Sequence, residues 1–167
     1  MPPSAPPKRN PSRPSASPDR RRLPILLRRA WYGLNQAFRR RIAHTGLTPD
    51  QFTVLRTLTE GDPRGLTQRE LTRLMSSDPN TIASLLERME TAGWIERHPH
   101  ETDRRAHRIR VPAPGRKKLA ELRDIALQLQ SEVLSVLPPS QREPFLDRLA
   151  SVADACHVAA EQFQRKS

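Results

Sequence analysis

Apolar side chains recur at intervals of three and four residues through much of this chain, which is the spacing of amphipathic helices. The first such stripe predicts a helix over residues 24–43, and its members are Leu27, Trp31, Leu34, Phe38 and Ile42. A second helix begins at Pro49, because Thr48 and Gln51 suit a capping box and proline fits the first helical position. It turns Phe52, Leu55 and Leu58 inward and ends near Gly61.

Two short helices follow, separated by a tight break. Thr67 and Glu70 suit a second capping box, which opens a helix with Leu71, Leu74 and Met75 on one face. Residues 76–79 end that helix and begin another over about 79–91, with Ile82, Leu85, Leu86 and Met89 inward. Gly93 is expected to end it in the left-handed conformation. A helix pair joined in this way is a helix-turn-helix.

The spacing of apolar residues changes after Gly93, from a helical period to an alternating one. Residues 94–97 are short and extended, and residues 106–111 alternate, with His107, Ile109 and Val111 on one side and Arg108 and Arg110 on the other. The polar stretch between them forms the tip of a hairpin. A charged hairpin directly after a helix-turn-helix predicts a winged helix.

Two long helical stripes close the chain, on either side of Pro138 and Pro139. Their steps of three and four residues are heptad-like, and they pack on each other, on the first helix, or on a second copy of the chain. We favour a homodimer, because these helices lie outside the central unit and have little else to cover. The expected dimer contacts are Leu27, Leu34, Leu122, Leu129, Val133, Leu149, Val152 and Phe163. Cys156 lies on the last stripe and is expected to be a buried, inert thiol.

Composition divides the 167 residues into a tail and one domain. Residues 1–19 contain seven prolines and three apolar residues, which predicts disorder, and residues 20–167 form a single domain. The net charge is +11, yet residues 1–41 alone carry 11 basic side chains and one acidic side chain. The tail is either a solubilising arm or an arm that strengthens nucleic-acid binding without sequence preference.

The basic excess points to nucleic acid or an anionic membrane surface as the partner. No apolar run is long enough to span a membrane, and one cysteine excludes a disulfide framework. We expect a cytoplasmic protein.

The second helix of the helix-turn-helix has a polar outer face suited to the major groove of DNA. Small polar side chains let a helix approach base edges, asparagine matches adenine, and arginine matches guanine or phosphate. The candidate DNA contacts here are Ser76, Ser77, Asn80, Thr81, Ser84 and Arg88. Free amides at the helix start, with Ser76 and Ser77, are expected to hold a phosphate, whereas Asp78 is expected to cap the helix.

The hairpin tip adds Asp103, Arg104 and Arg105, and Arg108 follows them. A basic finger beside a groove-reading helix suits the DNA backbone and the narrow minor groove. Arg105 is the candidate for minor-groove insertion, and Asp103 is expected to pair with an arginine and stiffen the turn.

These features together resemble bacterial MarR-type (multiple antibiotic resistance) transcriptional regulators. The resemblance covers about 24–164 and is most specific in 66–118, through the helix-turn-helix, the stretch LLERMETAGWIER, and Asp103-x-Arg105 with Gly115 after it. It implies a mainly α fold with a small β-hairpin wing, in which a winged helix-turn-helix over about 48–111 dimerises through helices 24–43 and 115–164. It maps the family's wing Asp and Arg onto Asp103 and Arg105. Where the family commonly has Leu-Thr before the next helix, this chain has Val111 and Pro112, so a hydroxyl cap is absent.

The resemblance also implies a pocket for a small aromatic effector, for which Trp31, Tyr32 and His44 are the candidates. We expect no cofactor and no metal, because the wing histidines lack a ligand scaffold. No phosphate-binding loop and no nucleophile–base motif is recognisable, so we expect no enzyme.

The predicted function is that of a dimeric, sequence-specific transcriptional regulator, a ligand-responsive repressor that binds a pseudo-palindromic double-stranded operator. Two alternatives stay open: a non-specific architectural DNA-binding protein, and a winged-helix interaction module with no role on DNA.

Overall fold

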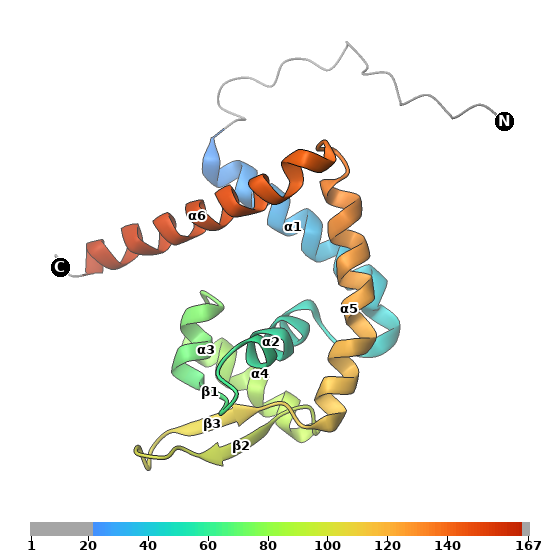
Figure 1. Cartoon of the computed structure of the whole chain (residues 1–167). Helices are drawn as coiled ribbons and strands as arrows, with labels where there is room; N and C mark the ends of the chain where they lie inside the picture. Colours follow the sequence, from blue (N-terminus) through green and yellow to red (C-terminus); the bar gives the residue numbers. More distant parts are fainter. Residues whose placement is uncertain (1–21, 165–167) are drawn as a thin grey trace, which may run out of the picture.

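The computed structural model describes residues 22–164 and forms the predicted mainly α winged helix-turn-helix (Figure 1). Its helices are α1 (Leu23–Ile42), the 3-10 turn η2 (Ala43–Thr45), α2 (Pro49–Glu60), α3 (Gln68–Leu74), α4 (Pro79–Thr91), α5 (Ala113–Leu134) and α6 (Pro139–Gln164). The proline-rich segment 1–19, predicted to be disordered, lies outside the described residues.

The local signals that predicted the helix starts are present as hydrogen bonds. The Thr48 hydroxyl accepts from the Gln51 amide at 3.3 Å, and the Thr67 hydroxyl accepts from the Glu70 amide at 3.2 Å. Both capping boxes are complete, so each helix begins where its cap dictates. The missing hydroxyl before α5 is equally visible, because Pro112 caps this helix with no side-chain hydrogen bond.

The sheet has three strands where the sequence predicted two. Strands β2 (Glu96–Pro99) and β3 (His107–Arg110) form the wing, and β1 (Leu66–Thr67) pairs with the other edge of β3. The prediction missed β1 because two residues are too short to show an alternating pattern. Since β1 leads directly into α3, the pairing of β1 with β3 connects the helix-turn-helix to the wing by backbone hydrogen bonds.

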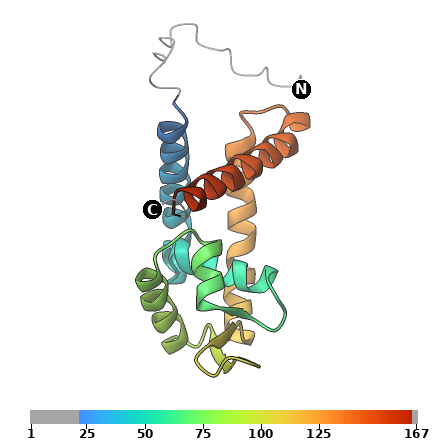
Figure 2. The same ribbon diagram turned by 90° about the vertical axis from the view of Figure 1, so that its left-hand side faces the viewer.

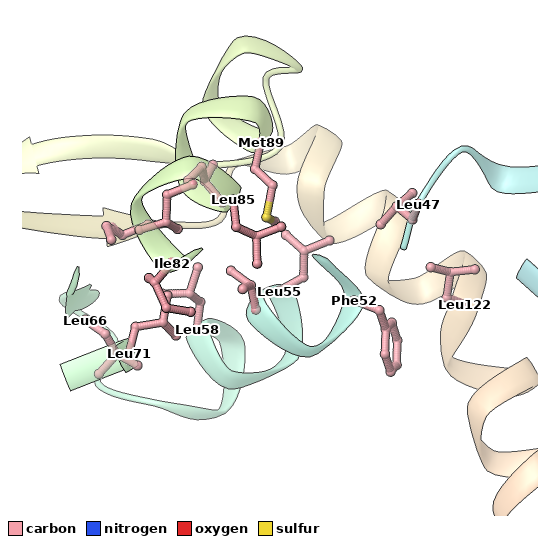
Figure 3. Close-up of a cluster of buried hydrophobic side chains, with 14 of the residues drawn as sticks. Leu47, Phe52, Leu55, Leu58, Leu66, Leu71, Ile82, Leu85, Met89 and Leu122 are labelled. Carbon is pink, nitrogen blue, oxygen red and sulfur yellow. The ribbon is translucent and has the colours of Figure 1, made fainter. Parts of the chain in front are cut away.

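The core lies between α2, α3, α4, α5 and the sheet, with the end of α1 packed against it (Figure 3). The inward stripe predicted for α4 is confirmed, since Ile82, Leu85, Leu86 and Met89 are all buried. Leu74 was predicted inward with Leu71 but is 54% exposed. Residues three apart on a helix differ by about 60° around its axis. Met75 lies about 40° from Leu71 in the other direction and packs partly against the core, so the inward face of α3 is formed by Leu71 and Met75.

The first and fifth helices pack on the core and on each other. Arg41 of α1 pairs with Glu132 of α5 at 2.7 Å, and Phe38 and Ile42 are buried in the main cluster. Leu122 and Leu129 of α5 lie in this same cluster. The prediction that these two leucines contact a second chain was therefore wrong, because they fill the interior of their own chain.

The last helix makes few contacts with the rest of the described chain, and it lies at the end of the molecule opposite to the wing (Figures 1 and 2). Phe145 and Leu149 of its apolar stripe are exposed. Cys156, predicted to be buried, is exposed as well, because no other element within residues 22–164 covers it. The side chain of Phe163 lies outside the described residues.

The start of α5 approaches the chain after α4 so closely that only glycine fits. A Cβ atom on Gly115 would lie 2.0 Å from the carbonyl oxygen of Trp94. We expect Gly115→Ala to lower the free energy of unfolding by about 1–3 kcal/mol, as overpacking typically does, measured by urea denaturation. Gly33→Ala is the control, because the exposed Gly33 in α1 has no atom within 4 Å of its Cβ position. Alanine there should raise stability by about 0.5–1 kcal/mol, and equal stability of the two variants would contradict the close approach.

Candidate nucleic-acid interface

The polar residues predicted to read DNA share the solvent-facing side of α4. Asn80, Thr81, Ser84 and Arg88 are exposed, whereas the opposite stripe of the helix is buried. Arg88 lies along the helix, with its Nε donating to the carbonyl oxygen of Ser84 at 3.2 Å. Since the buried stripe fixes the rotation of α4, these side chains form one polar surface.

The turn before α4 is closed by hydrogen bonds of its own backbone. Ser76, exposed and with a φ of 48°, adopts the left-handed conformation that ends α3. Its amide donates to the carbonyl of Arg73, and the amide of the half-buried Ser77 donates to that of Thr72. Four residues are therefore enough to redirect the chain from α3 into α4.

Asp78 closes the start of α4, as expected of a capping residue. One carboxylate oxygen accepts from the amides of Asn80 at 3.0 Å and Thr81 at 2.9 Å, and the other accepts from the Thr81 hydroxyl. The Thr81 hydroxyl and then these amides lower the pKa of Asp78. The expectation that these amides are free to hold a phosphate was wrong, because the carboxylate already occupies them.

The tip of the wing is built from tight turns around two side chains. His100 Nδ1 accepts from the amides of Thr102 at 3.3 Å and Asp103 at 3.2 Å, and Asp103 accepts from the amide of Arg105 at 2.9 Å. Asp103 thus stiffens the turn through a backbone amide rather than through an arginine side chain. Arg104 and Arg105 are exposed, and no ion pair to either guanidinium occurs among the described residues.

The wing histidines serve the hairpin and do not gather as ligands. His98 Nε2 lies 3.2 Å from Glu96, and His100 Nε2 lies 3.7 Å from Glu101. Within residues 22–164, no three histidine, cysteine or carboxylate side chains form a group able to hold a metal.

Arg108 is on the side of β3 opposite to Ile109, as the alternating pattern predicted, but it does not face solvent. It is 7% exposed, and its guanidinium contacts Glu101, Glu70 and the carbonyl oxygen of Gly65. The expected exposure failed because Ile109 is buried in the core on one face of β3, while segments distant in the chain cover Arg108 on the other face. The acidic residues at 70 and 101 were the available signal for a partnered arginine.

A cleft of about 740 Å³ lies between the wing and the first turns of α3 and α4, and no sequence pattern predicted it. Pro79 of α4 and Arg105 of the wing both line it, together with Arg69 of α3 and Arg97 of β2. Arg97 is paired with Glu90 at 3.2 Å. These arginines come from separate elements, so only the fold brings them to one cleft.

The effector candidates lie apart from this cleft. Trp31 and Tyr32 are on α1 and are 63% and 60% exposed, and His44 is exposed in η2. None of the three lines the cleft at the wing. No helix within the described part of the chain is both long and apolar enough to cross a membrane.

Comparison with known proteins agrees with this geometry. The family model described as "MarR family" matches residues 45–106. Transcriptional regulator HosA of Escherichia coli O111:H- is 28% identical over 135 residues, which is 78% of this chain and 98% of HosA.

Two solved structures share the fold. The transcriptional repressor CouR bound to a 23-mer DNA duplex has a TM-score of 0.73 and 26% identity, over 85% of this chain and 99% of CouR. BpsR of Bordetella bronchiseptica, whose DNA binding is regulated by 6-hydroxynicotinic acid, has a TM-score of 0.72 and 24% identity, over 81% and 95% of the two chains.

Proposed function

We propose that this chain is a DNA-binding transcriptional regulator of the MarR family rather than an enzyme, and that it works as a homodimeric repressor on a two-fold symmetric operator. Each protomer inserts α4 into a major groove and the wing into the adjacent minor groove. The two half-sites lie about one helical turn apart, roughly 34–36 Å. Because its partner is chromosomal DNA, the proposed place of action is the cytoplasm.

The observation that carries this proposal is the position of the cleft. Its lining brings together Arg69 in the first turn of α3, Pro79 at the start of α4, and the wing residue Arg105. In duplex DNA, one phosphate backbone separates each major groove from the neighbouring minor groove. A reader with α4 in one groove and the wing in the other therefore has that backbone over the cleft, where Arg69 is an exposed cation.

The proposed base contacts follow from side-chain chemistry. Asn80 offers an amide to adenine, Arg88 offers a guanidinium to guanine or phosphate, and Arg105 enters the minor groove. The remaining proposed DNA contacts are Ser76, Ser77, Thr81, Ser84, Asp103 and Arg104.

Exposed apolar side chains support the proposed dimer. Leu34 of α1, Val133 of α5, and Phe145 and Leu149 of α6 are large hydrophobic residues open to solvent in the single chain. A second copy that covers them removes this apolar area from water. The proposed contacts are thus Leu27, Leu34, Val133, Leu149, Val152 and Phe163, without the two core leucines of α5.

Regulation by a small molecule is proposed from the relatives. CouR is a repressor, and BpsR responds to 6-hydroxynicotinic acid. We propose a small aromatic effector for this chain, with Trp31, Tyr32 and His44 as candidate contacts. It acts by favouring a different separation of the two α4 helices.

Arg105→Ala tests the minor-groove contact. We expect the variant to fold normally and to bind its specific duplex about 1–3 kcal/mol more weakly, measured by fluorescence anisotropy at fixed salt. Arg123→Ala, which removes an exposed arginine of α5, is the control and should bind like the wild type. Equal affinity of both variants would remove Arg105 from the interface, and equal binding of specific and random duplexes by the wild type would favour an architectural role.

Leu149→Glu tests the dimer. A charge on the exposed apolar stripe of α6 should convert the protein to a monomer and weaken specific binding by about tenfold or more, because one protomer reads only one half-site. Ser151→Glu adds the same charge to an exposed polar position of the same helix and should remain a dimer. Sedimentation velocity measures both, and a dimeric Leu149→Glu variant contradicts the assigned interface.

A further inference from the structure

The guanidinium of Arg108 joins three segments that are far apart in the sequence. Its Nε donates to Glu101 at 3.2 Å, at the tip side of the wing. Its Nη1 donates to the carbonyl oxygen of Gly65 at 3.1 Å, just before β1, and lies 3.7 Å from Glu70. Arg108 itself is on β3, so one side chain connects the wing, β1 and the first turn of α3.

Because Arg108 is buried, its contacts restrict movement of the wing relative to α3. The Arg108 side chain is 9% exposed, so its guanidinium has lost most of its water, and a buried charge is tolerated only when partners satisfy it. Its rigid fork also needs its acceptors in fixed directions, which a flexible ammonium does not. Movement of the wing away from α3 would separate Arg108 from Glu70 and Gly65 and leave the charge without partners.

The acidic partners are held in place as well. Glu70 is part of the α3 capping box, where the amide and hydroxyl of Thr67 lower its pKa, with a further contribution from Arg108. The pKa of Glu101 is lowered by its own backbone amide and by Arg108. Both carboxylates are therefore charged at neutral pH, and they lie 3.7 Å and 3.2 Å from guanidinium nitrogens of Arg108.

From this arrangement we propose that Arg108 is a positioning residue, which holds the wing at a fixed place relative to α4 and thereby aims Arg105 at DNA. This inference rests on the proposed function. Arg108 touches no DNA in it, since its guanidinium is buried between protein groups. The exposed Arg105, three residues earlier in the chain, makes the contact, and Arg108 determines where that contact falls.

A double-mutant cycle separates positioning from a general structural role. In the wild type, Arg105→Ala costs affinity for the specific duplex. In an Arg108→Met background the wing is no longer held, so the same Arg105→Ala change should cost less than about twofold. Additive effects of the two substitutions would overturn the proposal, because a merely structural residue lowers affinity without altering the effect of Arg105.

Hydrogen exchange of the free, full-length protein gives a readout that needs no DNA. We expect Arg108→Met to increase exchange about tenfold or more at the amides of residues 98–106, while the amides of α4 stay protected. Arg56→Met is the matched control, because Arg56 is an exposed arginine of α2 paired with Glu60. It should change neither exchange at the wing nor the cycle. Unchanged wing exchange in folded Arg108→Met would overturn the proposal.

Glu101→Gln provides a second test in case the Arg108→Met variant does not fold. It removes only the wing-side charge, from a half-exposed residue, and should raise wing exchange in the same direction by a smaller factor. Protection equal to the wild type in this variant counts against the proposal. If Arg105→Ala is harmless in the wild type, the proposed minor-groove contact fails, and the exchange data alone decide whether Arg108 holds the wing.

Discussion

The orientation of the candidate DNA-reading surface follows from the burial of one apolar stripe of α4. Ile82, Leu85, Leu86 and Met89 enter the core, so the helix cannot rotate without exposing them. The opposite face, with Asn80, Ser84 and Arg88, is thereby presented to solvent at a fixed angle. Asp78 fixes where the helix begins. A surface that reads DNA needs this rigidity, because base edges are distinguished by donors and acceptors at fixed positions.

The arginines around the wing differ by their partners rather than by their type. Arg108 is buried between carboxylates, Arg97 is paired with Glu90 at the cleft, and Arg104 and Arg105 reach into solvent. The net charge of the wing therefore overestimates the number of arginine side chains that are available to contact a phosphate backbone. The free cations lie at the tip, and the partnered ones connect the tip to the body. This division of roles lets a two-stranded hairpin keep its orientation while its end stays open to DNA.

Sequence reasoning succeeded where the signal was local. The capping boxes at Thr48 and Thr67 and the apolar stripe of α4 depend on residues within one or two turns, so the helices and most of the core could be predicted. It failed where a residue's surroundings come from distant segments. Arg108 fits the strand alternation, but its side chain is buried against Glu101 and Gly65, which are 7 and 43 positions away in the sequence.

For the terminal helices, too, the sequence pattern did not predict which residues are buried within the chain. Heptad spacing marked Leu122, Leu129 and Cys156 alike as stripe residues. The spacing carries no information on which neighbour covers a stripe, and here α1 and α2 pack against α5 while α6 is left uncovered. The candidate DNA contacts of α4 were predictable because exposure follows from the buried stripe, whereas the cleft required arginines from separate elements.

Selection of bound duplexes from a random pool, by the full chain and by its Asn80→Ala variant, tests whether the polar face of α4 reads base edges. We expect a two-fold symmetric consensus for the wild type, and for the variant the same consensus with the preference relaxed at one base pair in each half-site. A consensus without two-fold symmetry, or one that the Asn80→Ala substitution leaves unchanged, would contradict this expectation.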